Sequence, residues 1–295
     1  MRKTIQGGLR LSQEIEDLLV ARNLRGMAKI KTVLQPGYCL RAAKLLSSCR
    51  GTVLIGTGFP VDNTFETDGP AGAISLYQAL ERIGVEPIIV CGAPVSHALI
   101  NDYRVIELAN GADAQKEGRH TAIETLEQFQ PSLVISIERP GQAHDGGYYN
   151  MRGELISLNT ACFDPFMELA NCPTIAIGDG GNEIGMGNVH NALRDLNIVP
   201  AATLCDELIV ADVSNWGGHA LVALLGWLRQ TDLLADFDNQ GTLQYLSERG
   251  CVDGVTRLST LTEDSLPATA GSGMISQLRH LTGFLSHDDL LQQMA

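Results

Sequence analysis

Two carboxylates lie in a glycine-rich stretch, residues 56–72, which reads GTGFPVDNTFETDGPAG. Gly56 and Gly58 allow the main chain to turn sharply and a ligand to approach it closely. Glu66 and Asp68 precede a Gly-Pro pair, which is typical of a helix start. One interpretation is that Asp68 caps this helix. Capping does not explain Glu66, so we expect both acids to bind a ligand.

A second stretch, residues 178–187, reads GDGGNEIGMG and holds five glycines in ten positions. Asp179, Asn182 and Glu183 supply oxygen atoms of the kind that Mg²⁺, Mn²⁺ and Ca²⁺ prefer. A plain glycine turn with an aspartate cap is the alternative, but the glycine density favours close approach of a ligand. The glycines that we expect beside it are Gly180 and Gly181.

The third stretch, residues 138–153, reads ERPGQAHDGGYYNMRG and mixes acids, bases and aromatic residues. Arg139 or Arg152 could bind a substrate carboxylate through two parallel hydrogen bonds. Glu138 or His144 could transfer a proton. A solvated loop with surface ion pairs is the alternative interpretation. Two amides complete the predicted substrate loops, Asn150 in this stretch and Asn215 after a later apolar run.

Five short apolar runs must position these loops, and each run ends at a glycine or an acid. They are residues 52–55, 87–90, 133–137, 174–177 and 208–211, and stretches with helical character separate them at 71–83, 97–110 and 121–129. Strands that are apolar on both faces and alternate with helices predict an α/β fold with a mostly parallel central sheet and helices on both faces. Such sheets bind ligands beyond the carboxyl ends of their strands, where these glycines and acids fall.

Additional helices are predicted at both ends of the chain. Residues 9–27 and 38–48 carry apolar positions at helical spacing, and the part from about residue 233 onward has a similar pattern. We interpret residues 1–295 as one domain. A small helical subdomain, formed by about residues 1–45 and the C-terminal tail, is the alternative.

Composition excludes several classes of function. The sequence has 21 Lys and Arg and 34 Asp and Glu. The resulting net charge of −13 repels nucleic acid and anionic membranes. Val61 occupies the place of the third glycine of a dinucleotide fingerprint, and no Gly-Lys-Ser/Thr motif occurs, so we expect no nucleotide cofactor. The expected partner is a small amino-acid substrate, and the chain could form a homo-oligomer.

The ends and cysteines of the chain indicate a cytoplasmic protein. The N-terminus lacks the continuous apolar segment of a secretory signal, and the apolar run at residues 216–228 is too short to span a membrane. The 7 cysteines show no C-x-x-C spacing. Buried, reduced thiols are therefore expected.

Several segments resemble those of the D-glutamate cyclase family in sequence, order and spacing, and the resemblance spans about residues 10–290. The type that they resemble forms the C-terminal half of the mitochondrial enzyme and occurs alone in bacteria and archaea. The segments are Glu66–Gly72 (ETDGPAG), Glu138–Gly141 (ERPG), Tyr149–Gly153 (YNMRG) and Gly178–Gly187 (GDGGNEIGMG), with residues 214–218 and 252–255 in support. The resemblance implies a lyase that closes D-glutamate into 5-oxo-D-proline with loss of water.

This reaction suggests how the candidate residues act together. We expect Glu66, Asp68, Asp179 and Glu183 to converge on one divalent cation that polarises the γ-carboxylate. In this hypothesis, either predicted arginine binds the α-carboxylate, and Glu138 or His144 takes the proton of the amine. A metal-dependent phosphohydrolase and a non-catalytic protein that binds a small ligand are the two alternatives.

Overall fold

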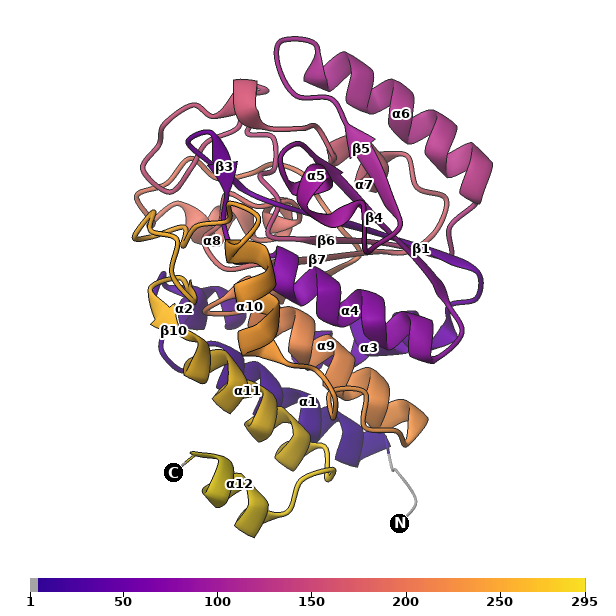
Figure 1. Cartoon of the computed structure of the whole chain (residues 1–295), viewed down its shortest axis with the longest axis vertical. Coiled ribbons are helices and arrows are strands. Elements are labelled where there is room, and N and C mark those ends of the chain that lie inside the picture. Colours follow the sequence, from indigo (N-terminus) through magenta and orange to yellow (C-terminus); the bar gives the residue numbers. More distant parts are fainter. Residues whose placement is uncertain (1–4, 295) are drawn as a thin grey trace.

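The computed structural model describes residues 5–294 and has a six-stranded sheet at its centre (Figure 1). Residues 1–4 and 295, which the predicted domain includes, lie outside this range. All neighbouring strands of the sheet are parallel. In spatial order the strands are β5 (Val105–Leu108), β4 (Glu86–Gly92), β1 (Thr52–Thr57), β6 (Leu133–Ile137), β7 (Thr174–Gly178) and β8 (Glu207–Val210). The predicted parallel α/β fold is confirmed.

The strand order creates a switch point between β1 and β6. From β1 the chain builds outward through β4 to β5, and it then returns to place β6 on the other side of β1 before continuing to β7 and β8. Loops that leave β1 and β6 therefore diverge beyond the carboxyl ends of these strands. Doubly wound sheets bind ligands in the crevice that this divergence opens.

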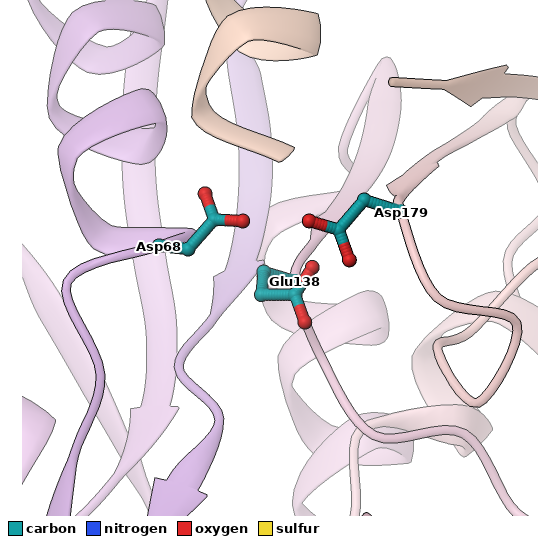
Figure 2. Close-up of side chains that lie close together, drawn as sticks. All are labelled: Asp68, Glu138 and Asp179. Carbon is teal, nitrogen blue, oxygen red and sulfur yellow. The ribbon is translucent and has the colours of Figure 1, made fainter. Parts of the chain in front are cut away.

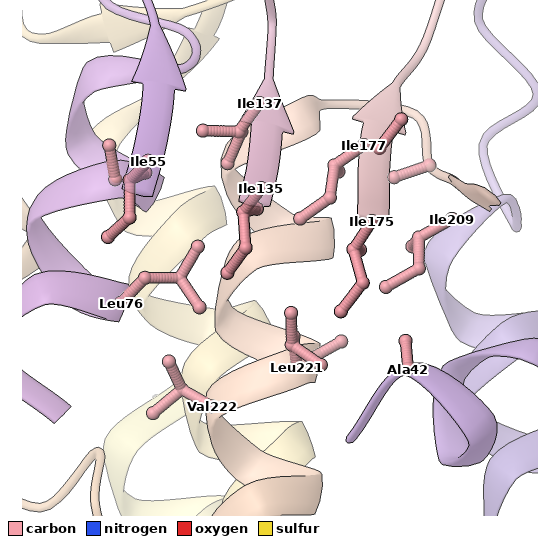
Figure 3. Close-up of a cluster of buried hydrophobic side chains, with 14 of the residues drawn as sticks. Ala42, Ile55, Leu76, Ile135, Ile137, Ile175, Ile177, Ile209, Leu221 and Val222 are labelled. Carbon is pink, nitrogen blue, oxygen red and sulfur yellow. The ribbon is translucent and has the colours of Figure 1, made fainter. Parts of the chain in front are cut away.

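Branched aliphatic residues make the strands and bury them on both faces. Ile135 pairs with Ile55 on one side and with Ile175 on the other, and all three are fully buried. Figure 3 shows this isoleucine layer against Leu221 and Val222, which belong to helix α9 (Ser214–Arg229). Burying one such side chain is worth about 1.5–3 kcal/mol, so this layer fixes the sheet rigidly beneath the loops.

Helices cover both faces of the sheet (Figure 1). On one face lie α3 (Tyr38–Ser48), α4 (Pro70–Arg82) and α9, and on the opposite face lie α5 (Val95–Leu99) and α6 (Ala114–Phe129), with α7 (Asp164–Glu168) beside α6. The terminal helices form a further layer outside α9, as their contacts with α9, α3 and α4 show. They are α1 (Ile5–Leu19), α10 (Asn239–Ser247), α11 (Ala268–Leu281) and α12 (His287–Met294).

Two predicted helices are wrong in their bounds. Residues 97–110 do not form one helix, because the short α5 ends at Leu99 and the edge strand β5 follows. This edge strand is half exposed, so its sequence lacks the apolar run that marks the inner strands. The predicted helix over residues 9–27 ends at Leu19, and α2 (Met27–Lys31) is separate. Asn23 and Gly26 between them have φ of 52° and 84°, which a continuing helix cannot accommodate.

Short elements surround the carboxyl edge of the sheet. A hairpin of β2 (Pro60–Val61) and β3 (Thr64–Phe65) follows β1, and a second hairpin of β9 (Thr262–Glu263) and β10 (Leu266–Pro267) precedes α11. The loops after β6 and β7 contain η1 (Ser157–Asn159), η2 (Met186–Val189) and α8 (His190–Leu193). These irregular segments leave the carboxyl ends of β1, β6 and β7 accessible to a ligand.

The cysteines and the lengths of the helices bear on two further predictions. All seven cysteines are free, and five of them are buried, as predicted for thiols: Cys39, Cys49, Cys91, Cys162 and Cys251. Within residues 5–294, the helices are too short or too polar for any of them to cross a membrane.

Candidate active site

Three carboxylates meet at the switch point of the sheet, and we call them the acid cluster (Figure 2). Asp68 comes from the loop after β1, Glu138 directly follows β6, and Asp179 directly follows β7. All three are buried, and one oxygen of each lies within 4.8 Å of the others. Oxygen ligands bind divalent ions at about 2.0–2.6 Å, so oxygens on one ion lie at most about 5 Å apart. The acid cluster therefore has the size and chemistry to hold one divalent cation.

Burial and mutual repulsion make these acids hard to ionise together. Burial raises the pKa of Asp68 to about 8, and the charge of Asp264 adds to the shift. Burial also raises the pKa of Glu138, with contributions from the charges of Glu183, Asp68 and Glu66. The pKa of Asp179 is raised for the same reason. At neutral pH this arrangement requires bound protons or a bound cation.

Arg25 supplies a positive charge beside the acid cluster, and the sequence did not indicate it. Its Nη2 atom donates to the carboxylates of Asp179 and Asp264 and, at 3.2 Å, to the carbonyl of Asp212. Burial alone would lower its pKa, but the attraction of Asp179 and Asp264 outweighs burial and raises it. The Asp212 carboxylate also fixes the Arg25 loop, because it accepts hydrogen bonds from the main-chain nitrogens of Arg22 and Leu24 at 2.7 and 3.1 Å.

Asp264 is the second residue that the sequence did not indicate. It sits in the two-residue turn between β9 and β10, where Asp264 and Ser265 have φ of 52° and 66°. Both values match the turn type that joins tight hairpins, which usually uses Asn-Gly or Asp-Gly. Aspartate and serine bear more strain there than glycine would, and such strain is concentrated at functional sites.

Asp68 and Asn215 hold two helix N-termini together. The Asp68 carboxylate accepts hydrogen bonds from the main-chain nitrogens of Ser214 and Asn215 at 2.8 and 2.7 Å, at the start of α9. In return, the Asn215 side-chain oxygen accepts from Gly69 and Gly72 at 2.8 and 2.7 Å, at the start of α4. Asp68 thus caps α9 and not the helix that follows it, which corrects one interpretation of the sequence. Asn215 acts in this brace and does not line the cavity described below.

The Glu183 carboxylate is bound by its own loop. It accepts hydrogen bonds from the main-chain nitrogens of Gly180 at 2.9 Å and Gly181 at 2.7 Å. Burial raises its pKa, although these N–H groups lower it. The Asn182 side chain donates to the Tyr149 carbonyl at 2.8 Å, while its buried oxygen has no partner among residues 5–294. That oxygen is a candidate acceptor for a ligand ammonium group.

Glu66 stands beside the acid cluster. It is buried, and burial together with the charges of Asp264 and Asp68 raises its pKa. Gly254 packs so closely against it that a Cβ atom at that position would lie 1.8 Å from Glu66 Oε2. The glycine therefore leaves room for the carboxylate to face the acid cluster.

A cavity of about 830 Å³ opens beside these acids. Its inner end is polar and is lined by Arg25, Glu66, Glu138, Asp179, Asn182, Glu183 and Asp264. Its outer end is formed by residues 150–159 and by Val255 and Arg257. Of the predicted site residues, Arg152 and Asn150 lie on this outer part, and the Asn150 amide donates to Glu154 at 2.6 Å.

Arg139 does not face this cavity, contrary to its predicted role. Its guanidinium is buried and donates to the carbonyls of Thr57 at 3.0 Å, Gly58 at 3.3 Å and Ala161. It lines a separate space of about 20 Å³, large enough for one water molecule. We interpret Arg139 as a link between the loop after β1 and residue 161.

His144 is also placed outside the cavity. It is exposed, and its ring contacts that of His190 with the centroids 4.7 Å apart. Asp164 accounts for this position, because it accepts hydrogen bonds from the Gln142 main chain at 2.9 Å and from the Tyr148 hydroxyl at 2.6 Å. The segment between these anchors is turned toward solvent, so proton transfer by His144 has no structural support.

The first two predicted glycines serve packing. Gly56 lies within β1, where a Cβ atom would be 2.5 Å from the Phe163 ring. Gly58 has φ of 101°, and a Cβ there would be 2.7 Å from the Val95 side chain. Both allow neighbouring side chains to approach the main chain, and neither lines the large cavity.

Comparisons with known proteins point to one family. A family model described as "D-glutamate cyclase-like, C-terminal" matches residues 15–279. The mitochondrial D-glutamate cyclase of Homo sapiens is 32% identical over 219 residues, which cover 63% of this chain and 34% of the human protein. The chain therefore spans only about a third (34%) of the length of that relative.

Among solved structures, the chain has a partial likeness to an exopolyphosphatase-related protein from Bacteroides fragilis. It covers 89% of this chain and 61% of its own, with 10% identity and a TM-score of 0.40. A likeness at this level supports no functional argument.

Proposed function

The chain belongs to the D-glutamate cyclase-like family, and from this premise we propose that it closes D-glutamate into 5-oxo-D-proline with loss of water. The observation that carries the proposal is the acid cluster at the switch point of the sheet. Carboxylates from three separate loops are buried there, beside a cavity that can admit an amino acid. A structural role alone does not account for burying so many acids together.

The reaction requires the α-amine to attack the γ-carboxyl carbon of the same molecule. The ammonium group must lose a proton before it can attack, and the carboxylate must be made electrophilic. Because both reacting groups belong to one molecule, holding them in position lowers much of the barrier. An acidic cavity binds the ammonium group, and the free oxygen of Asn182 can accept a hydrogen bond from it.

The donor set of the acid cluster fits a divalent cation such as Mg²⁺, Mn²⁺ or Ca²⁺. Asp68, Glu138 and Asp179 would hold it, in place of the four-residue set expected from the sequence. When bound, such an ion supplies Lewis acidity toward a carboxylate oxygen. Arg25 helps to hold Asp179 in place, since its guanidinium donates a hydrogen bond to the Asp179 carboxylate.

Glu66 is the proposed general base. It lines the cavity at its inner end, where a carboxylate can take a proton from the ammonium group and give one back to the departing oxygen. Glu66 and Glu138 thereby exchange the roles expected from the sequence. Arg152 lies on the outer part of the same cavity and is the proposed partner of the α-carboxylate.

The test is turnover of D-glutamate by the purified chain, with the product resolved by chiral chromatography. We expect 5-oxo-D-proline to form, and we expect Glu66→Gln to lower kcat by about 10²–10⁴-fold, the usual size of general acid–base catalysis. Glu248→Gln is the matched control, because Glu248 is exposed and does not line the cavity.

Removal of divalent ions with EDTA tests the metal separately. Activity should disappear and return when Mg²⁺ or Mn²⁺ is added. Full activity without divalent ions would end the metal proposal, and no product under any metal condition would end the proposed function.

A further inference from the structure

The cavity is much larger than D-glutamate requires. Its volume of about 830 Å³ falls within the range of roughly 300–1,000 Å³ that accommodates drug-sized ligands. Free glutamate is far smaller, and a substrate bound at the acidic inner end leaves the outer part of the cavity unfilled. The outer part therefore needs an explanation of its own.

The outer part carries large apolar side chains among its polar ones, whereas the acids dominate the inner end. Met151, Leu155, Leu158 and Val255 line it, and we call them the outer wall. Their exposed fractions are 36%, 64%, 70% and 47%. Large apolar side chains that gather on one exposed surface usually mark a place where something binds.

Polar contacts hold the outer wall in place. The Asn150 side-chain oxygen accepts hydrogen bonds from the main-chain nitrogens of Arg152 and Glu154 at 2.9 and 3.1 Å. The Asn159 amide donates to the Asp62 carbonyl at 2.8 Å. Arg257 pairs with the Asp62 carboxylate at 3.0 Å. Leu155 and Leu158 are thus presented on a segment that is tied at both ends, which favours a preformed subsite.

The chemistry of the reaction determines which part of the substrate reaches the outer wall. The amine and the γ-carboxyl group react with each other, so both must lie at the acidic inner end. The α-carboxyl group is the remaining functional group of glutamate, and it takes no part in ring closure. A substituent can therefore be attached there without blocking ring closure, and its amide then replaces the ion pair proposed between Arg152 and the α-carboxylate.

We propose that the substrates include D-glutamate extended at its α-carboxyl group by an apolar residue, as in a peptide with an N-terminal D-glutamate. The α-nitrogen forms a bond to the γ-carboxyl carbon, and one carboxyl oxygen leaves as water with two protons from the ammonium group. The product is the 5-oxo-D-prolyl peptide, with the peptide bond unchanged. The proposal rests on the proposed function, because it uses the same reaction at the same acids.

The experiment compares free D-glutamate with D-glutamyl-leucine and D-glutamyl-glycine. The two dipeptides have the same charges and differ only in the apolar side chain. We expect kcat/KM for D-glutamyl-leucine to exceed that for D-glutamyl-glycine about tenfold, as contact with one buried aliphatic group allows. The products are identified by mass, through the loss of one water molecule.

Variants of the outer wall sharpen the test. The double variant Leu155→Ser, Leu158→Ser should remove the tenfold preference and leave turnover of free D-glutamate within about twofold. Leu204→Ser is the control, because Leu204 is 62% exposed and does not line the cavity. It should change neither substrate.

The outcomes separate the two proposals. Turnover of free D-glutamate without a preference for D-glutamyl-leucine overturns the inference and leaves the proposed function intact. Turnover of D-glutamyl-leucine without turnover of free D-glutamate supports the inference and replaces the proposed substrate. If no compound is cyclised, the proposed function fails and the inference fails with it.

Discussion

Two kinds of buried acid lie near the start of α9, and they differ in how many hydrogen-bond donors surround them. Glu263 is fully buried and accepts hydrogen bonds from the side chains of Asn215 at 2.9 Å, Trp216 at 3.2 Å and Asn239 at 3.4 Å. Glu138 of the acid cluster accepts one from the Ser214 hydroxyl at 2.5 Å and otherwise faces other acids. Burial alone therefore does not identify a site.

The contrast shows what marks a functional acid in this fold. Burial raises the pKa of Glu263 as well, but three side-chain donors offset part of this cost, so we interpret its role as structural. Around the acid cluster, Arg25 is accompanied by several carboxylates whose pKa values are all raised by burial. That imbalance is maintained at a cost in stability, which is typical of sites that bind a cation or a substrate.

The largest expected effect comes from substituting an acid of the acid cluster, and it is an effect on activity. Glu138→Gln removes one charge from the acid cluster, so kcat should fall by about 10³-fold, in line with the several kcal/mol that a bound metal ion supplies. Because repulsion is also removed, the free energy of unfolding without divalent ions should not decrease. Chemical denaturation and turnover of D-glutamate measure the two quantities.

Glu263→Gln is the matched substitution, and it should behave in the opposite way. An amide cannot accept hydrogen bonds at both ends, so the free energy of unfolding should fall by about 1–3 kcal/mol. Activity per folded molecule should stay within a few fold of the native value. Equal losses of activity in the two variants would contradict the distinction between the two groups of acids.

The pH dependence of stability should reveal the acid cluster next. Asp68 has a pKa of about 8 in the folded protein, against an ordinary value of 3.8. Its neutral form is favoured by folding, so the stabilisation is complete below its ordinary pKa and is lost as pH rises through 8. Denaturation of the metal-free protein should therefore show a loss of a few kcal/mol between about pH 5 and pH 8.

The same titration in Glu138→Gln and Glu263→Gln sharpens this result. In Glu138→Gln the free energy of unfolding should fall less steeply with pH, because one source of repulsion is gone. In Glu263→Gln its dependence on pH should be close to that of the native protein. A native protein whose stability rises over this range would contradict the raised pKa values.

Divalent ions should reverse the loss at high pH. An ion that binds only the folded state stabilises it by about 2.7 kcal/mol at a hundredfold excess over Kd. We expect Mn²⁺ or Mg²⁺ to raise Tm, with a larger shift at pH 8 than at pH 6 because protons compete for the same oxygens. Glu138→Gln should abolish the shift, which distinguishes the acid cluster from exposed acids elsewhere.

The smallest predicted effect comes from one methyl group. Gly254→Ala places a Cβ 1.8 Å from Glu66 Oε2, so the carboxylate must move away. If Glu66 is the base, kcat should fall about tenfold, because misplaced catalytic groups lose part of their effect. Gly273→Ala is the control, since an added Cβ there meets no atom within 4 Å. Unchanged kcat in Gly254→Ala would weaken the role proposed for Glu66.

Much of the fold could be predicted because its signals are local. Every strand buried on both faces is a short aliphatic run that ends at glycine or an acid, so β1, β4, β6, β7 and β8 were evident. The edge strand β5 was not, because a strand with one exposed side needs no continuous apolar run. Asp179 was found for the same local reason, since it directly follows β7, and Asp68 was found because it precedes the Gly-Pro start of a helix.

The rest of the candidate site depends on tertiary contacts. Arg25 follows a helix and looked like part of it, and only the left-handed turns at Asn23 and Gly26 bring it inward. Asp264 lies in a short hairpin whose turn does not have a typical sequence. The residues predicted with the wrong surroundings, Arg139 and His144, lie in a loop whose path is set by contacts with residues 161 and 164.

The bond between Arg25 and Asp264 joins residues 239 positions apart, and the bonds that link Asp68 to Asn215 span 147. On the ribosome, Arg25 and Asp68 therefore emerge well before Asp264 and Asn215, the residues that bond them. Long-range closure of this kind slows folding. Until the last segments are released, a growing chain has Arg25 without Asp264, so the inner end of the cavity stays incomplete.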